Sequence, residues 1–232
     1  PLTDDFTIRK EDYFRENGGI IFPNPNAPTG VELGMQDVEA IIKANPDVIV
    51  VVDEAYVDFG AASALPLIEK YDNLLVVQTF SKSRGMAGMR IGYAMGNPVL
   101  IKYLNDVKYS FNSYTMDQTT LALGAAAIAD RAYFEETVHK VVETREWTKK
   151  ELTKLGFVFG DSKANFIFAS HPEIPAADLF AALREANIIV RYFNKPRIAN
   201  YLRITIGTQE DMEKLIEFLK KYVTVQSQAR SE

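Results

Sequence analysis

The 232-residue sequence contains no cysteine and only two histidines, His139 and His171, which lie far apart in the chain. It therefore cannot form disulfides or thiolate-bound zinc and iron–sulfur sites, and we expect no protein metal site. No run of about eighteen apolar residues occurs, and the first residues carry no signal pattern, so we expect a cytoplasmic protein without a membrane span. The chain starts at Pro1 without an initiator methionine, which we interpret as a sign that residues upstream are missing.

An excess of basic residues is also lacking. The formal net charge is −5 and the isoelectric point is near 5.3. Binding to nucleic acid requires clustered lysine and arginine on one face, so we expect no nucleic-acid partner. With 47% hydrophobic and 25% charged residues, the chain can bury a core as a globular protein does. Small molecules or proteins are therefore the expected partners.

Apolar runs in the first half predict a mostly parallel sheet. The β-branched run of residues 48–53 is typical of a strand that is covered on both faces. The gaps between the first three runs are long enough for helical crossovers, whereas the gap from Phe80 to Arg90 is too short for one. We therefore expect strands at 19–23, 48–53 and 74–78 in parallel, helices at 33–44 and 61–70, and an antiparallel strand at 91–95.

The second half predicts a smaller α+β unit. Helical spacing covers residues 98–108, 117–130 and 131–155, and Gly156 is placed to end the last of these helices. Beyond it we expect strands at 157–159, 166–169, 188–190 and 201–206, helices at 177–186 and 209–222, and a frayed polar tail from 224 to 232. The predicted fold class is α/β with a large domain (1–138) and a small α+β C-terminal domain (139–232), linked by the helix at 131–155.

The polar stretch from Thr79 to Arg90 is the first candidate for a chemical site. It follows a strand at the carboxyl edge of the parallel sheet, where open α/β sheets bind ligands. Lys82 in this stretch is either a solvated lysine or a Schiff-base lysine. The neighbouring cations Arg84 and Arg90 would favour the neutral amine that a Schiff-base lysine needs.

Asp53 and Tyr56 follow the most apolar strand. A carboxylate that faces a ring nitrogen is what a pyridinium cofactor requires, although Asp53 could also cap a loop. Tyr56 could reach the same pocket with its phenol or could serve in ordinary packing. Neither residue alone decides between these interpretations.

Two sets of residues could bind anions. Thr79, Ser81 and Arg90 offer two hydroxyls and a guanidinium around one turn, which suits a phosphate group unless Arg90 pairs with a surface carboxylate. Arg203 lies on the opposite strand face from Leu202. It could bind a carboxylate or phosphate or face water, and Arg191 is a weaker candidate of the same kind.

Four motifs carry a resemblance to a known family. They are Asn24-Pro-Asn-Ala-Pro-Thr-Gly30, Asp53-Glu-Ala-Tyr56, Ser81-Lys82 with Arg90 eight residues later, and Leu202-Arg-Ile-Thr-Ile-Gly207. In order and spacing the chain resembles the pyridoxal-phosphate aminotransferases of the aspartate aminotransferase fold (fold type I), and within them the histidinol-phosphate aminotransferases. The resemblance covers nearly the whole chain and corresponds to the C-terminal two thirds of such enzymes, so the large domain would be incomplete at its N-terminus.

This resemblance implies a cofactor, pyridoxal 5'-phosphate, and a homodimer. It implies that Lys82 binds the cofactor covalently and transfers the substrate proton, and that Arg203, assisted by Arg191, binds the substrates glutamate and histidinol phosphate in histidine biosynthesis. The implied cofactor contacts are Asp53 at the ring nitrogen, Tyr56 at the ring hydroxyl, and Thr79, Ser81 and Arg90 at the phosphate. Alternatives are a threonine-phosphate decarboxylase, another class I/II aminotransferase that acts on aromatic amino acids, and an inactive truncated fragment.

The chain departs from the family pattern at one position. Ala27 stands where the family usually has an asparagine that bonds the cofactor's ring hydroxyl. Asn24 or Asn26 could replace that bond, or Tyr56 could act alone.

Overall fold

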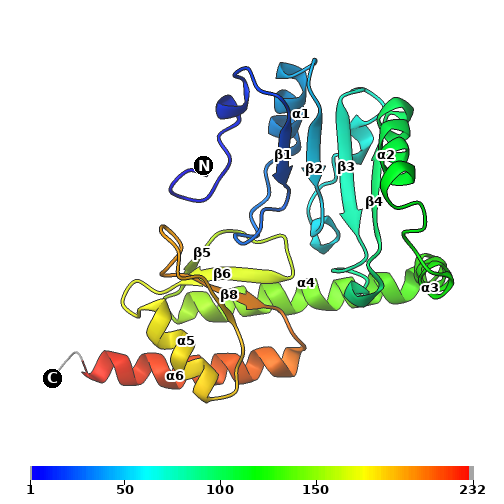
Figure 1. Cartoon of the computed structure of the whole chain (residues 1–232). Coiled ribbons are helices and arrows are strands. Elements are labelled where there is room, and N and C mark those ends of the chain that lie inside the picture. Colours follow the sequence, from blue (N-terminus) through cyan, green and yellow to red (C-terminus); the bar gives the residue numbers. More distant parts are fainter. Residues whose placement is uncertain (1, 230–232) are drawn as a thin grey trace.

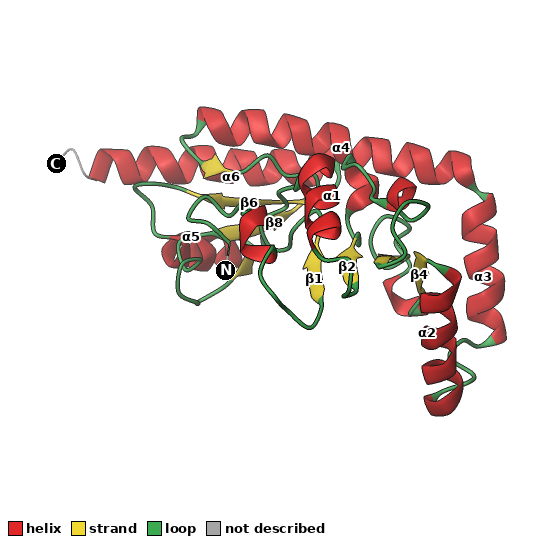
Figure 2. Ribbon diagram, turned by 90° about the horizontal axis from the view of Figure 1, so that it is seen from above, coloured by secondary structure: helices red, strands yellow, loops and turns green. Residues whose placement is uncertain are grey.

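The computed structural model describes residues 2–229 and contains two four-stranded sheets, with strand orders β1-β2-β3-β4 and β5-β6-β8-β7. The long helix α4 (Arg131–Lys154) runs past both sheets (Figure 1). Seen from above, α4 and the C-terminal helix α6 lie side by side (Figure 2). Helices α2 and α3 lie at the end of the molecule opposite the C-terminus. The chain therefore forms two sheets with one helix in common.

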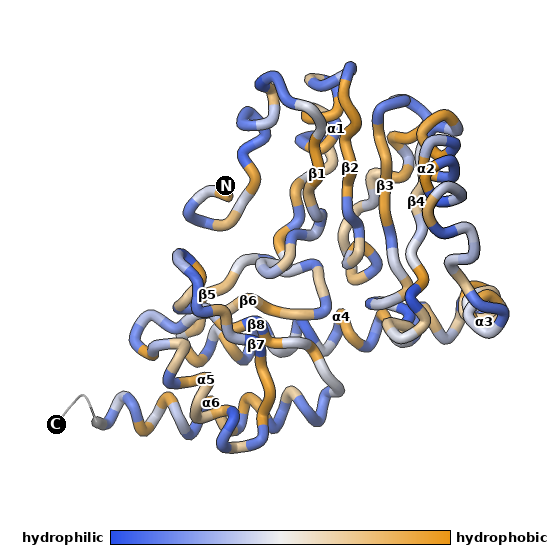
Figure 3. The backbone as a smooth tube through the Cα atoms, in the orientation of Figure 1, coloured by the Kyte–Doolittle hydropathy of each residue, from blue (hydrophilic) through white to orange (hydrophobic). Residues whose placement is uncertain are grey.

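The first sheet has the predicted strand directions. Strands β1 (Ile20–Pro23), β2 (Val50–Asp53) and β3 (Leu74–Thr79) are parallel, and β4 (Gly92–Gly96) is antiparallel to β3. The strands are among the apolar segments of the chain (Figure 3). In this register Asp53 lies beside Val77, so the polar residues that follow β2 and β3 meet at the same edge.

One predicted helix is wrong. Helix α1 (Met35–Ala44) connects β1 and β2 as expected and buries Val38 and Ile41. Between β2 and β3, however, the expected helix at 61–70 is replaced by two short 3₁₀ turns, η2 (Val57–Phe59) and η3 (Leu65–Leu67). Pro66 has no backbone N–H to donate, and the Ser63 hydroxyl and the Ala64 N–H bond to the Glu54 carboxylate, which fixes the chain between the two turns.

Three helices follow with side-chain caps at their first turns. These are α2 (Pro98–Phe111), α3 (Gln118–Ala129) and α4. Asn97, Asp117 and Asp130 accept hydrogen bonds from backbone N–H groups of the first turns, which satisfies donors that a helix leaves free. Gly156, with φ of +81°, follows the end of α4 as predicted.

The second sheet is antiparallel throughout. It comprises β5 (Val158–Phe159), β6 (Phe166–Ser170), β7 (Arg191–Tyr192) and β8 (Leu202–Thr205). Helices α5 (Ala176–Glu185) and α6 (Gln209–Ala229) pack on it through buried side chains such as Leu183 and Leu219. The second core therefore lies between this sheet, the two helices and α4.

Two predicted boundaries in this part are wrong. The strand expected at 188–190 lies at Arg191–Tyr192, because the backbone N–H of Ile188 bonds to Leu183 and still belongs to the end of α5. The tail expected from 224 is helical to Ala229, since α6 continues; residues 230–232 lie outside the described part of the chain. The domain boundary between 138 and 139 stays a prediction. Within residues 2–229, no helix is both long and apolar enough to span a membrane.

Candidate active site

The carboxyl edge of the first sheet brings the predicted acid and phenol together. Asp53 ends β2, is half-buried, and accepts one hydrogen bond, from the Ala55 N–H at 3.0 Å. Tyr56 lies in the turn that follows and is also half-buried. The Asp53 carboxylate therefore retains acceptor capacity for a ligand.

Lys82 lies in the loop after β3. The loop is closed by backbone bonds from Gly85 to Lys82 and from Met86 to Phe80, 3.1 and 3.0 Å long. The Lys82 Nζ lies 5.4 Å from the centre of the Tyr56 ring. Among residues 2–229, the Lys82 side-chain amine has no hydrogen-bond or ion-pair partner, and the side chain is exposed, so the amine is accessible to a ligand.

The three predicted phosphate ligands lie on the same turn. The Thr79 hydroxyl accepts from the Ser81 N–H and donates to the Ile91 carbonyl, both at 3.1 Å, so it already stabilises the turn. Arg90 has the left-handed φ of 55° and donates to the Ala87 carbonyl at 2.8 Å. Its other guanidinium N–H groups face no acceptor in the described part of the chain, and its side chain is exposed. The turn can therefore offer Arg90 and the Ser81 hydroxyl to an anion.

Arg203 points from β8 towards two aromatic rings. Its guanidinium carbon lies 5.0 Å from the Phe166 ring centre and 5.8 Å from that of Phe193. Its Nε is buried, and within residues 2–229 it has no hydrogen-bond partner. A buried donor without a partner is costly, so this position favours an anionic ligand.

Arg191 is the cross-strand partner of Arg203 in the β7–β8 pair. Its guanidinium carbon lies 5.5 Å from the Phe193 ring centre, and its side chain is exposed. Both arginines therefore flank the same ring, and Arg191 lies on the solvent side.

Ring contacts join the two sheets at this site. The Tyr56 and Phe166 rings pack edge to face, with centres 5.0 Å apart and an interplanar angle of 85°. Because Tyr56 also lies under Lys82 and Phe166 under Arg203, continuous contacts run from the lysine to the arginine. The structure thus brings an amine from the first sheet and a guanidinium from the second to one region.

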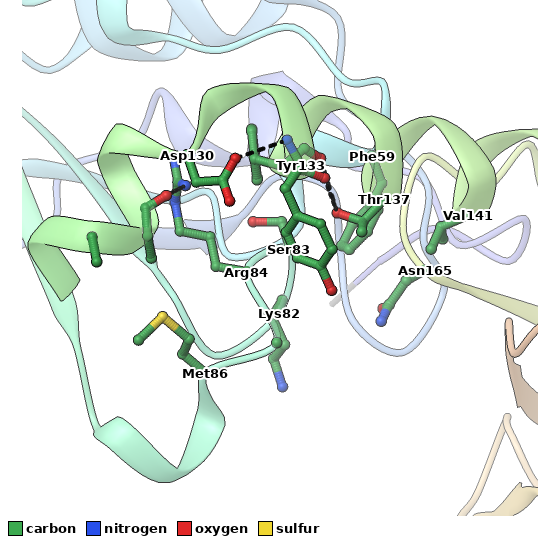
Figure 4. A pocket seen from close by; sticks show the side chains of 14 residues that line it. Phe59, Lys82, Ser83, Arg84, Met86, Asp130, Tyr133, Thr137, Val141 and Asn165 are labelled. Atoms are coloured by element: carbon green, nitrogen blue, oxygen red, sulfur yellow. Dashed lines mark hydrogen bonds between the residues drawn. The ribbon is translucent and has the colours of Figure 1, made fainter. Parts of the chain in front are cut away.

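The loop of residues 82–86 forms one wall of a cavity of about 460 Å³. Figure 4 shows the side chains that line it. Lys82, Tyr133 and Asn165 are among the residues that line it. Arg84, which we considered as a cation beside Lys82, stacks on Phe134 at 4.1 Å and donates to the Ala127 carbonyl at 2.6 Å. Arg84 therefore fastens the loop to α3 and α4.

Sequence reasoning missed Glu54. Its side chain is buried, and its carboxylate accepts from the Ser63 hydroxyl, the Ala64 N–H and the Gln78 amide at 2.6–2.8 Å. Gln78 in turn accepts from the Tyr93 hydroxyl, and burial, with the negative charge of Asp58, raises the pKa of Tyr93. The available signal was a second acid directly after Asp53, because neighbouring side chains of an extended chain point to opposite faces.

Two asparagine residues precede Ala27, and their side chains differ in their hydrogen bonds within the described part of the chain. Both ends of the buried Asn24 side chain bond to the Leu33 backbone, at 3.0 and 2.7 Å, so Asn24 cannot replace the missing asparagine without breaking the loop. The Asn26 carbonyl oxygen accepts from the Thr29 hydroxyl at 2.9 Å. The side-chain nitrogen of Asn26, Nδ2, makes no hydrogen bond within residues 2–229, and Ala27 is exposed.

Comparison with known proteins identifies the family of the chain. A family model described as "Aminotransferase class I and II" matches residues 3–219. The chain belongs to this aminotransferase family. The aminotransferase chain is 54% identical over 223 residues to a histidinol-phosphate aminotransferase of Lactococcus lactis subsp. cremoris (strain SK11), covering 96% of this chain and 63% of that protein.

A second relative has the same name and a similar coverage. A histidinol-phosphate aminotransferase of Pseudomonas syringae pv. syringae (strain B728a) is 56% identical, with 94% of this chain and 63% of that protein covered. The aminotransferase chain therefore spans less than two thirds of the length of these relatives.

Solved structures share the fold. A histidinol-phosphate aminotransferase from Sinorhizobium meliloti in complex with pyridoxal-5'-phosphate matches with a TM-score of 0.77 and 25% identity, over 90% of this chain and 58% of that chain. An aspartate aminotransferase mutant from Thermus thermophilus matches with a TM-score of 0.77 and 24% identity, over 94% and 64%. The predicted α/β fold of the aspartate aminotransferase type is thereby confirmed.

Proposed function

We propose that the chain provides the catalytic part of a histidinol-phosphate aminotransferase, which transfers an amino group between glutamate and histidinol phosphate. The observation that carries the proposal is the accessible Lys82 amine, connected through Tyr56 and Phe166 to Arg203 with its unpaired Nε. The names of relatives at 54% and 56% identity support the choice of substrates.

The donor set fits pyridoxal 5'-phosphate. Lys82 offers a free amine for the aldehyde, Asp53 a carboxylate with spare acceptor capacity for the ring nitrogen, and Tyr56 a phenol for the ring hydroxyl. Ser81 and Arg90 offer donors for the phosphate, and Thr79 fixes their turn through its two hydrogen bonds. When bound, this cofactor supplies an aldehyde that reacts with amines and a ring that withdraws electrons from the substrate's α-carbon.

Lys82 performs the proton transfer in this proposal. With the cofactor bound, the Lys82 Nζ would be the base that takes the α-proton of the substrate and returns it. The Tyr56 ring beneath it keeps Nζ near this position. The Asp53 carboxylate, through its charge, favours a protonated ring nitrogen.

Arg203 binds the anionic end of each substrate in turn. A planar guanidinium can bind both the carboxylate of glutamate and the phosphate of histidinol phosphate through two parallel hydrogen bonds. Phe166 and Phe193 hold the guanidinium in place by packing against its faces. Arg191, across the strand pair, adds positive charge on the solvent side.

The test is a pair of half-reactions. The 232-residue chain, and a version extended at its N-terminus with the corresponding part of the Lactococcus lactis relative, are incubated with pyridoxal phosphate and glutamate, and 2-oxoglutarate is measured. We expect 2-oxoglutarate up to about the amount of cofactor, a further increase when the keto form of histidinol phosphate is added as acceptor of the amino group, and no product from Lys82→Ala. Carbon dioxide release from threonine phosphate, without 2-oxoglutarate from glutamate, would contradict the proposal in favour of a decarboxylase.

The homodimer and the cytoplasmic location also stay predictions. Support for a second chain comes from apolar side chains around the end of α2, where Val107, Phe111 and Tyr114 are 67%, 91% and 94% exposed. Exposed apolar patches of this kind mark surfaces that another chain or segment covers. Sedimentation of the extended version at micromolar concentration tests the dimer, and a monomer would contradict it.

A further inference from the structure

Arg145 is a buried cation without a buried counter-charge among the residues that the structure describes. It lies in the middle of α4, and its side chain is 2% exposed. Its Nε donates to Glu146 at 2.9 Å, but the Glu146 side chain is 45% exposed. Burial of a guanidinium is costly unless its N–H groups are satisfied, so the other contacts of Arg145 decide what it does.

Those contacts are two backbone carbonyls from opposite sides of the site. Arg145 Nη1 donates to the Phe59 carbonyl at 2.7 Å and to the Ala164 carbonyl at 3.0 Å. Phe59 ends the turn that begins after Tyr56, and Ala164 lies two residues before Phe166. One planar group thus binds both segments whose rings, Tyr56 and Phe166, form the contact between the two sheets.

The second of these segments is fixed independently at its other end. Lys149, one turn further along α4, donates to the Ser162 carbonyl at 3.0 Å and pairs with Asp161 at 2.7 Å. The Lys163 N–H bonds to the Gly30 carbonyl at 2.8 Å. The segment from 161 to 164 therefore has little freedom to adjust if Arg145 is changed, and the Arg145 bonds set its distance from Phe59.

We propose that Arg145 is a positioning residue that sets the separation between the Lys82 side and the Arg203 side of the active site. The inference rests on the proposed function for the meaning of that separation. A substrate must reach the amine with one end and the guanidinium with the other, so a shift of either side reduces productive binding. Arg145 touches neither substrate nor cofactor and acts only through the Phe59 and Ala164 carbonyls.

Hydrogen–deuterium exchange of the chain without cofactor tests the positioning directly. In Arg145→Met we expect peptides that cover residues 57–62 and 163–168 to exchange faster by about tenfold, because the two carbonyl bonds are lost. Peptides from β3 and α6 should keep the wild-type rates. The control is Lys140→Met, which removes an exposed cation of the same helix that pairs with Glu136, and it should change neither segment.

A second readout in the extended version separates this inference from the proposed function. Arg145→Met should raise the half-saturating glutamate concentration by about tenfold or more, while trapping of pyridoxal phosphate on Lys82 stays at the wild-type level. Arg145→Lys keeps the charge but cannot bond to both carbonyls with the same geometry, so it should give the same pattern in smaller degree. This variant also provides the test if Arg145→Met does not fold.

Unchanged exchange in both segments of Arg145→Lys, or a uniform rise across all peptides, would overturn the inference. Equal loss of Lys82 trapping and of glutamate binding would also overturn it, because Arg145 would then act through general stability. Failure of the wild type to trap the cofactor would count against the proposed function alone, since the exchange result does not depend on it.

Discussion

The Tyr56 and Phe166 rings meet edge to face at 5.0 Å, although one follows a strand of the first sheet and the other begins a strand of the second. Lys82 lies against the first ring and Arg203 against the second. The Lys82 amine and the Arg203 guanidinium thereby reach the same region from two separate cores. The consequences of this arrangement can be tested residue by residue.

Replacement of Arg203 by lysine should weaken substrate binding. A lysine keeps the charge but loses the planar pair of donors, and hydrogen bonds to charged groups contribute about 1.5–3 kcal/mol, or roughly 10- to 100-fold in binding. We expect the half-saturating concentration of glutamate to rise by that factor, as measured from the initial rate of 2-oxoglutarate formation. Arg184→Lys, at an exposed position in the last turn of α5, serves as the control and should bind glutamate as the wild type does.

Glu54→Gln should destabilise the fold. The buried carboxylate accepts three hydrogen bonds, and a glutamine would direct an N–H group at one of these donors. We expect the free energy of unfolding in urea to fall by about 2–3 kcal/mol. Glu69→Gln changes an exposed glutamate in the same connection and should leave the unfolding midpoint where it is. Equal midpoints for both variants would show that the Glu54 bonds contribute no net stability.

Gly30→Ala should disturb the contact between the two parts of the chain. Gly30 has φ of +77°, and a Cβ there would lie 2.2 Å from the Ser162 hydroxyl oxygen. That hydroxyl is held by bonds to Phe166 and Ala164, so it cannot move away at low cost. We expect a loss of about 2 kcal/mol or more in the free energy of unfolding. Gly18→Ala, with open space around the position, is the matched control, and a comparable loss there would contradict the steric account.

Acid should weaken the attachment of the segment from 161 to 164. The hydrogen bond from Lys149 lowers the pKa of Asp161, with a further contribution from Lys163. Because the pKa in the folded state lies below its unfolded value of about 3.9, the stabilisation is complete above that value and is lost as the pH falls through the folded-state pKa. Asp161→Asn should therefore lower the free energy of unfolding, measured in urea, at neutral pH. Below about pH 4 the free energy of unfolding of this variant should fall less steeply with pH than that of the wild type. A decline as steep as that of the wild type would contradict this role of Asp161.

Much of the fold could be predicted from local patterns. The β-branched run before Asp53 indicates a covered strand, and the short gap between Phe80 and Arg90 excludes a parallel crossover, which gives the antiparallel strand β4. The helix expected at 61–70 failed because its apolar spacing competes with Pro66 and with side-chain bonds to Glu54. Such bonds join residues whose meeting is visible only in the folded chain.

Some residues of the candidate site could likewise be predicted from local patterns, and others could not. Local patterns could select Asp53 at the end of a strand, Lys82 in the loop after a strand, and Arg203 on the face of a strand opposite its apolar side chains. Arg145 could not be selected in this way, since a helix that is polar over most of its length gives no sign that one arginine will be buried between two loops. The partnerless Arg203 Nε is likewise a property of the packing around Phe166 and Phe193.

The most direct test of the account is the site at which the protein binds pyridoxal phosphate. The extended version is mixed with an equimolar amount of the cofactor, reduced with borohydride and digested, and the modified lysines are identified by mass spectrometry. We predict that the label lies on Lys82, that it disappears in Lys82→Ala, and that it stays in the control Lys108→Ala. A label spread over surface lysines, or one that persists in Lys82→Ala, would contradict the central claim that Lys82 is the catalytic lysine.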